Sequence, residues 1–192
     1  MNFIPIIKTA VEEDTLPVLK TAFYPGTYGS FKLYMQYRPS IMDGQLHAAL
    51  FNYERDPDIS MDKMTDGSCC AVSLSRDQNS EVITAIVSAD GRGVLCLTGG
   101  PEKGVISKEQ ITPSISNGLD EVGWFWAASW TFPPDYISSM FPDGLAEGSS
   151  VFMNAYTFQN KGQFARFGAV LPVSEKSIFS PVNLHEFKIM RF

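Results

Sequence analysis

The chain has 192 residues, of which 44% are hydrophobic and 19% charged, and its net charge at pH 7 is -6. Such a composition is typical of a folded globular protein and excludes a disordered one. The 15 Lys and Arg residues are scattered. Nucleic acids and anionic membrane surfaces are therefore unfavourable partners, because both need clustered cations. We expect a single domain over residues 1–192.

Cysteine usage and the N-terminal sequence indicate the compartment. The cysteines are odd in number and two are adjacent, which argues against a disulfide framework, and no CxxC pair suggests a zinc ribbon. We expect Cys69, Cys70 and Cys96 to be core thiols. The opening MNFIPIIKTAVEEDTL lacks the basic region of a signal peptide, and no run of 18 apolar residues occurs. The sequence thus predicts a cytoplasmic protein without a membrane span, unless a leader is missing.

The first half of the chain is dominated by strand patterns. Residues 31–38, FKLYMQYR, alternate between apolar and polar positions, and Pro39 should end that strand. MDG then turns the chain into a second strand at 46–55. A polar loop follows, and three short strands joined by turn-rich segments predict an antiparallel meander over 70–75, 81–89 and 94–98. VITAIV is apolar on both faces, which predicts a central, covered strand.

The second half continues the pattern. Residues 99–120 should form a long connection with one more short strand, and residues 121–132 the strand that holds every tryptophan. Pro134 suits the first turn of a short helix over 134–141. The remaining strands are expected at 150–158, 164–171 and 185–192. Many short strands without long helical periodicity predict an all-β fold, an antiparallel sandwich of jelly-roll type with one or two short helices.

Sequence signatures of catalysis are missing from the chain. It contains no GxSxG, Walker, HExxH or GxGxxG motif. Its two histidines, His47 and His185, fall on or beside predicted strands, where packing is the simpler interpretation. We therefore predict no catalytic residue and no cofactor.

An acidic loop between two predicted strands is a candidate metal site. Its carboxylates are Glu54, Asp56, Asp58, Asp62 and Asp66. Calcium takes oxygen ligands of this kind, but the spacing lacks the glycine at the sixth position and the glutamate at the twelfth of an EF-hand loop. A solvated acidic loop is the prediction, and a calcium site is the alternative.

The segment GWFWAASW holds all three tryptophans at even spacing, so on a strand they share one face. Such a face either packs in the core or offers rings on which a sugar can stack. Trp130 precedes TFPP, where the chain bends, and we assign it to the core. At least one of Trp124 and Trp126 should face a ligand groove.

The order of motifs resembles that of family 9-like carbohydrate-binding modules over residues 30–192. FKLYMQYRPS, LHAALFNYERDP, DGSCCAVSLS and EVITAIVSADGRGVLCLTG are similar to the early strands of the family. The segment from Trp130 to Phe158, with Asn154 and Tyr156 in an Asn-x-Tyr motif, is the best match. Two features depart from the family, because EVITAIVSAD lacks the polar groups of the equivalent strand and FMNAYTF lacks a basic residue.

The resemblance implies a β-sandwich that binds a carbohydrate without catalysis. With the aromatic cluster, it gives these ligand-binding candidates: Trp124, Trp126, Asn154, Tyr156, Gln159 and Arg166. One alternative is a sugar-acting isomerase, lyase or hydrolase of the same fold, which would show a carboxyl group of raised pKa in a cleft. The other is a protein-interaction module with a flat apolar patch. The sequence specifies neither the sugar nor the oligomeric state.

Overall fold

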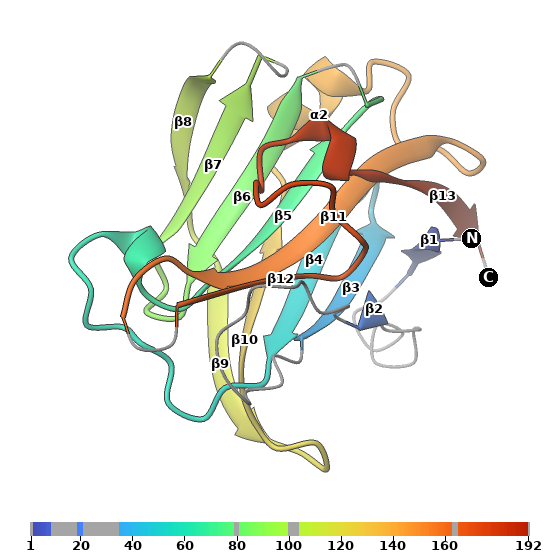
Figure 1. Ribbon diagram of the computed structural model, residues 1–192. Coiled ribbons are helices and arrows are strands. Elements are labelled where there is room, and N and C mark those ends of the chain that lie inside the picture. The colour runs from blue at the N-terminus through green and yellow to red at the C-terminus, as the bar shows by residue number, and fades with distance from the viewer. Residues whose placement is uncertain are drawn as a thin grey trace.

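The computed structural model describes residues 2–8, 19–20, 35–78, 81–99, 104–162 and 165–191 (Figure 1). Within these residues the chain is almost entirely β-structure, with helix α2 (Pro134–Met140) and two 3-10 turns, η1 (Met64–Asp66) and η2 (Pro181–Asn183). The strands are β1 (Asn2–Ile7), β2 (Leu19–Lys20), β3 (Met35–Met42), β4 (Gln45–Asn52), β5 (Cys69–Ser75), β6 (Val82–Ser88), β7 (Gly93–Thr98), β8 (Val105–Ile111), β9 (Ser114–Leu119), β10 (Trp124–Thr131), β11 (Ser150–Gln159), β12 (Arg166–Ala169) and β13 (His185–Arg191). No helix in the described ranges is long and apolar enough to cross a bilayer.

One continuous sheet folds over into two layers. The order is β8-β7-β6-β5-β11 in one layer and β13-β1-β3-β4-β10-β9 in the other. Strand β11 links them, because it pairs with β5 on one side and its first residues pair with β13 on the other. Figure 1 shows β11 as a long diagonal ribbon across the molecule. The predicted all-β sandwich with little helix is confirmed.

The sheet is mixed, which corrects the expectation of a wholly antiparallel sandwich. Strand β1 runs parallel to both of its neighbours, β13 and β3. A parallel neighbour needs a crossover of a dozen residues or more. The long sequence separations from β1 to β3 and from β1 to β13 provide it. The other strand pairs of the described chain are antiparallel, as predicted.

The core lies between the two layers. Inward side chains of both layers form one buried cluster, which includes Leu50, Val72, Trp126 and Trp130. Every residue of β5 and β6 is buried, so the predicted central, covered strand is confirmed. A second, smaller cluster covers the opposite face of β5 and β11 and contains Tyr156 and Phe167.

The turn between β3 and β4 follows directly from its sequence. Asp43 and Gly44 both have positive φ, 52° and 76°. Two such residues form the tight hairpin turn that matches strand twist, and Asp-Gly is a favoured pair for it. The predicted MDG turn is confirmed.

Pro39 does not end strand β3, which continues to Met42. On the side away from β4, β2 pairs with Gln36 and Tyr37, whereas β1 pairs with Ile41 and Met42. Pro39 lies between these two stretches. Its missing N–H therefore costs no ladder hydrogen bond among the described strands, and proline is tolerated.

Other predicted boundaries shift. The 46–55 strand ends at Asn52, the 121–132 strand begins at Trp124, and residues 99–120 contain two strands, β8 and β9. The chain passes from one layer to the other between these two strands, since β8 pairs with β7 and β9 with β10. Strand β12 covers only four residues of the expected 164–171 strand. Residues 31–34, 164 and 192, included in predicted strands, lie outside the described ranges.

Candidate functional site

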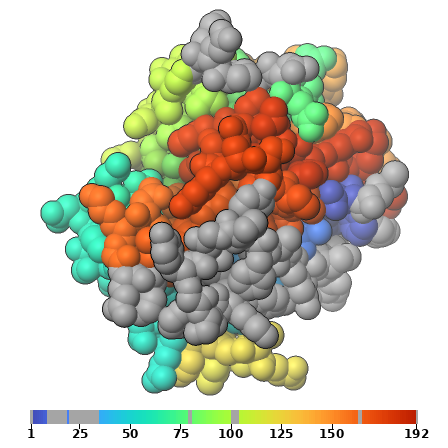
Figure 2. All heavy atoms as spheres, viewed as in Figure 1, coloured from blue at the N-terminus to red at the C-terminus, as the bar shows by residue number. Residues whose placement is uncertain are grey.

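The β9–β10 hairpin projects at one end of the sandwich, the lower end in Figure 1 and the yellow knob at the lower edge of Figure 2. Asp120 braces its turn by accepting hydrogen bonds from the backbone N–H groups of Val122 (2.8 Å) and Gly123 (3.1 Å). The hydroxyl of Tyr53 also donates to Asp120, at 2.6 Å. These contacts fix the hairpin against the segment that follows β4.

An exposed aromatic ring stands on this hairpin. Trp124 is 51% exposed, and its direct cross-strand partner Leu119 is exposed as well. A half-exposed indole on a braced hairpin is a preformed apolar surface, because little of its conformational freedom remains to be lost on binding.

A buried polar cluster lies behind this end of the sandwich, centred on the guanidinium of Arg166. Arg166 donates from Nη2 to Glu54 Oε2 (2.5 Å) and to Ser68 Oγ (3.2 Å), and from Nη1 to Gln159 Oε1 (3.0 Å). Its side chain is only 9% exposed and that of Glu54 only 14%. We call the group the Arg166 cluster; its members are Glu54, Asp58, Ser68, Trp126, Gln159 and Arg166.

Further hydrogen bonds connect the cluster. Ser68 Oγ donates to Glu54 Oε1 (2.8 Å) and accepts from the backbone N–H of Asp58 (2.8 Å). Gln159 Nε2 donates to Asp58 Oδ2 (3.1 Å), and Trp126 Nε1 donates to Glu54 Oε2 (3.1 Å). The cluster therefore joins β10 and the end of β4 in one layer to β5, β11 and β12 in the other. A buried ion pair needs such additional hydrogen bonds to offset its desolvation.

Strand register places Trp124 at the mouth of the cluster. Trp126 is opposite Asn52, the last paired residue of β4, and it donates to Glu54; Trp124 is the next residue on the same side of β10, beyond the end of that pairing. Positions 124 and 126 lie on one face of β10, about 7 Å apart along the strand. The exposed ring and the Glu54–Arg166 pair thus share one face at one end of the sandwich.

The structure separates the residues that the sequence grouped. Trp124, Trp126, Gln159 and Arg166 gather at this end. Trp126 is 0% exposed, however, so its ring has no free face for a sugar, and its predicted stacking role is corrected. Trp130 is buried beside Phe132, as predicted for a core residue.

Asn154 and Tyr156 lie on the other face of β11, because side chains alternate along a strand. The amide of Asn154 is fully used: it donates to the carbonyls of Leu171 and Asn183 and accepts from the N–H groups of Ala155 and Leu171. Tyr156 is wholly buried against Phe167, with ring centroids 5.8 Å apart. Satisfied hydrogen bonds for Asn154 and complete burial for Tyr156 contradict direct ligand contact by these two side chains in this structure.

Three members of the cluster were missed as site residues. Glu54 and Asp58 were assigned to the solvated acidic loop, and Ser68 to no role. Glu54 lies two residues beyond Asn52, the last residue of β4. Side-chain alternation continued past the end of the strand would have placed Glu54 on the inward face. Its partner Arg166 follows 112 positions later in the chain, and pattern reading alone does not reveal that contact.

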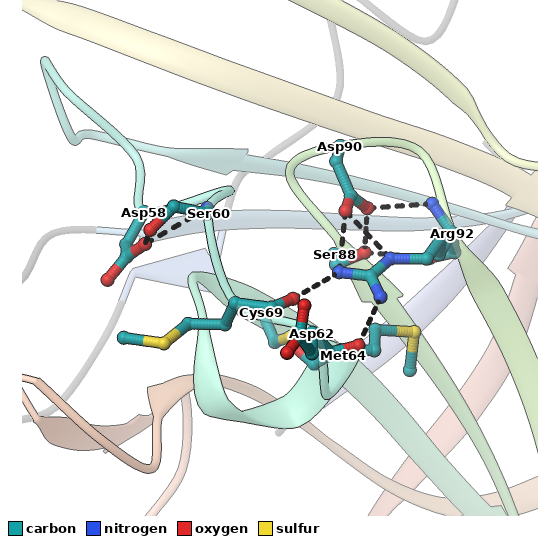
Figure 3. Close-up of polar contacts among 9 residues, drawn as sticks. Asp58, Ser60, Asp62, Met64, Cys69, Ser88, Asp90 and Arg92 are labelled. Carbon is teal, nitrogen blue, oxygen red and sulfur yellow. Dashed lines mark hydrogen bonds and ion pairs between the residues drawn. The ribbon is translucent and has the colours of Figure 1, made fainter.

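Arg92 holds the rest of the acidic loop. It donates to the carbonyl oxygens of Met61 (3.0 Å) and Asp62 (2.9 Å) and pairs with Asp90 at 2.6 Å, and it lies between the loop and the Asp90 turn in Figure 3. Partial burial would raise the pKa of Asp90, but hydrogen bonds from Arg92 and Ser88 outweigh it and lower that pKa. No group of three or more potential metal-ligating side chains occurs within the described residues.

The titration of carboxyl groups bears on the enzyme alternative. Two more carboxyl groups, those of Asp120 and Glu186, resemble Asp90 in having a lowered pKa. A hydrogen bond from Tyr53 lowers the pKa of Asp120, and hydrogen bonds from Ser150 and Lys188 lower that of Glu186. The pKa values of Asp90, Asp120 and Glu186 are thus all shifted downward, opposite to the direction that the enzyme alternative needs.

Comparison with known proteins identifies the fold. No family model matches the sequence, and no curated protein matches it. Among solved structures, a Bacteroides uniformis protein provisionally assigned as carbohydrate-binding superposes with a TM-score of 0.71, at 10% identity over 98% of both chains.

Two further structures come from a family 9 carbohydrate-binding module of Caldicellulosiruptor kristjanssonii. The complex with cellotriose gives a TM-score of 0.67 at 8% identity, covering 100% of this chain and 94% of that one. The complex with glucose gives 0.65 at 8% identity, covering 100% and 97%. The chain therefore has the fold of family 9 carbohydrate-binding modules.

Proposed function

We propose that this protein is a non-catalytic carbohydrate-binding module, and that it takes a saccharide at the end of the sandwich where Trp124 meets the Arg166 cluster. One observation carries the proposal: a half-exposed indole stands on a braced hairpin beside a largely buried ion pair with its surrounding hydrogen-bonding groups. A cluster of that kind offers donors and acceptors at fixed positions.

The two parts of the site suit the two sides of a sugar. The C–H groups on a pyranose face pack against an aromatic ring, which Trp124 supplies. Hydroxyl groups at the edge of the ring both donate and accept. Arg166 donates, and Glu54 and Asp58 accept, whereas Gln159 is buried and its amide is used within the cluster. A neutral hydroxyl-rich ligand therefore matches this site, with Trp124 giving contact area and the cluster giving orientation.

The fold adds support of a different kind. Family 9 modules of the same architecture hold glucose and cellotriose. Fold alone does not establish function, so the geometry of the site and the similarity of fold are two separate grounds for the proposal. A carbohydrate is the partner that best fits both the groups of the site and the ligands of the similar modules.

Titration calorimetry with glucose and with cellotriose tests the proposal on three proteins: the natural sequence, Trp124→Ala and Val182→Ala. Val182 is an exposed apolar residue of η2 and serves as the matched control. Trp124→Ala should reduce affinity by roughly tenfold or more, because stacking of a ring on an aromatic contributes about 1–3 kcal/mol in the comparable case of nucleobases. Val182→Ala should bind as the natural protein does. Equal affinity of all three proteins, or no binding of either sugar, contradicts the proposal.

A further inference from the structure

Strands β4, β10 and β9 lie side by side in one layer of the sandwich (Figure 1). Strand register arranges the side chains on their outer face, which points away from the core, in three rows. The rows are Phe51, Ala127 and Ser116; Arg38, Ala49, Ser129 and Ser114; and His47 and Thr131. The centre of this face therefore carries alanine and serine side chains between larger ones.

The small side chains leave a hollow at the centre of the outer face. Ala49 and Ala127 are each 8% exposed, yet neither belongs to the core cluster. Their methyl groups form the floor of the hollow. Arg38 stacks over Phe51, with its guanidinium carbon 5.0 Å from the ring centroid, and this pair forms one wall. The hollow is built on strands, which hold its lining in fixed positions.

Two adjoining cavities occupy the hollow, one of about 200 Å³ beside Phe51 and one of about 250 Å³ beside His47. Ser114 and Ser129 line both cavities, which therefore join into one groove that we call the β10 groove. Phe51 and His47 are four residues apart on β4, so the groove is about 13 Å long. Its two parts together reach the size of sites that hold small ligands.

The lining of the β10 groove is rich in hydroxyl groups. They belong to Thr112, Ser114, Ser116, Ser129 and Thr131. Those of the three serines make no hydrogen bond to another described residue, and a hydroxyl group both donates and accepts. The described lining contains no carboxylate, and the net charge of -6 disfavours a polyanion. A neutral ligand with many hydroxyl groups therefore fits the groove.

We propose that the β10 groove binds a chain of a neutral polysaccharide, as a second carbohydrate site apart from the one at Trp124. The length of the groove suits several linked sugar rings. Its hydroxyl groups meet those at the ring edges, and its alanine floor packs against C–H groups. The inference goes beyond the proposed function, because no lining residue of the groove belongs to the Arg166 cluster. The two sites can therefore be tested independently.

Phenylalanine substitutions that fill the groove test the proposal. Ser129→Phe and Ser114→Phe each place a ring where the two cavities meet, and both positions are exposed on strands, which accept phenylalanine. Gln110→Phe is the matched control, because Gln110 is exposed on β8 of the other layer and lines neither cavity. Electrophoresis through gels that contain hydroxyethylcellulose, arabinoxylan, glucomannan or galactomannan measures binding by the slowing of the protein.

At least one of these polysaccharides should slow the natural protein and Gln110→Phe equally. Ser129→Phe and Ser114→Phe should bind that polysaccharide roughly tenfold more weakly. In calorimetry, both groove variants should respond to glucose as the natural protein does. Circular dichroism and melting temperatures verify that each variant folds.

A second measurement needs no substitution in the groove. In a two-dimensional ¹⁵N–¹H spectrum of Trp124→Ala, the backbone amide signals of Ser114, Ser116 and Ser129 should shift on addition of cellohexaose or mannohexaose. This variant lacks the indole of the other site, so these shifts report on the groove.

The outcomes separate this inference from the proposed function. Equal slowing of the natural protein and both groove variants in every gel overturns the groove, and so does a natural protein that no polysaccharide slows. Groove signals that stay in place with both hexasaccharides also overturn it. If the groove variants lose polysaccharide binding while Trp124→Ala and the natural protein bind glucose equally, the groove stands and the Trp124 site is wrong.

Discussion

The three tryptophans of β10 should make sharply different contributions to stability. Truncating a buried large aromatic residue to alanine costs about 3–5 kcal/mol. Trp126 is 0% exposed and also donates to Glu54 within the Arg166 cluster, so Trp126→Ala should reach the upper end, about 5 kcal/mol. Trp130→Ala should cost about 3–4 kcal/mol, because its ring is buried but its Nε1–H has no partner in the described chain.

Trp124→Ala should cost less, about 1–2 kcal/mol. Half of the ring is already in water at 51% exposure. The buried half of roughly 100 Å² gives about 2.5 kcal/mol at 25 cal/mol per Å², which is an upper limit because the unfolded chain also buries some surface.

Phenylalanine substitutions isolate the hydrogen bond. Trp126→Phe keeps a buried ring and removes the donor to Glu54. The lost hydrogen bond should lower the free energy of unfolding by about 1.5–3 kcal/mol beyond the cost of the smaller ring, which is the range for a bond to a charged group. Trp130→Phe changes the same ring without losing a bond, and it is the matched control. Urea melts followed by far-UV circular dichroism measure all five variants. Equal losses for the two phenylalanine variants, or a loss for Trp124→Ala as large as for Trp126→Ala, refute this reasoning.

Three further predictions concern the acidic loop, acid stability and the thiols. A calcium chelator should change the melting temperature little, whereas Arg92→Ala should lower it and speed proteolysis near Met61; a large drop on chelation, reversed by calcium, contradicts this. The pKa of Asp90 lies below its ordinary value of 3.8, so the stabilisation from its pair with Arg92 is complete above that pH and is lost as the pH falls below it. Acid titrations should therefore show a shallower loss of stability in Arg92→Ala, and identical profiles would count against the pair. Burial raises the pKa of Cys69 to about 12, so alkylation at pH 8 should modify the buried cysteines only after unfolding; rapid labelling of the folded protein would show that they are accessible.

Local sequence patterns predicted the strands of the sandwich, because alternation and turn residues depend on positions close together in the chain. Alternation identified β3, and the apolar run VITAIV identified β6 as a covered strand. The Asp43-Gly44 turn followed from two positive φ angles that this pair tolerates. The prediction that Pro39 ends the strand was wrong. Whether a proline removes a ladder hydrogen bond depends on which strands lie beside β3 at that residue, and the positions of β1 and β2 decide this.

The candidate site could be predicted only in part for the same reason. Even spacing placed three tryptophans on one face, but the depth at which each lies depends on where the hairpin leaves the sandwich. Asn154 and Tyr156 were grouped with Gln159 although alternation sets them on opposite faces of β11. Contacts such as Arg166 with Glu54 join strands of different layers, and only the folded arrangement brings them together.

The indole N–H signals in a two-dimensional ¹⁵N–¹H spectrum test the central claim most directly. Each tryptophan gives one signal, which the phenylalanine variants at 126 and 130 and the alanine variant at 124 assign. On addition of glucose or cellotriose, the signals of Trp124, at the mouth of the site, and of Trp126, bonded to Glu54, should shift, while that of Trp130 should stay in place. Unchanged Trp124 and Trp126 signals at millimolar sugar would contradict a saccharide site at this end of the sandwich.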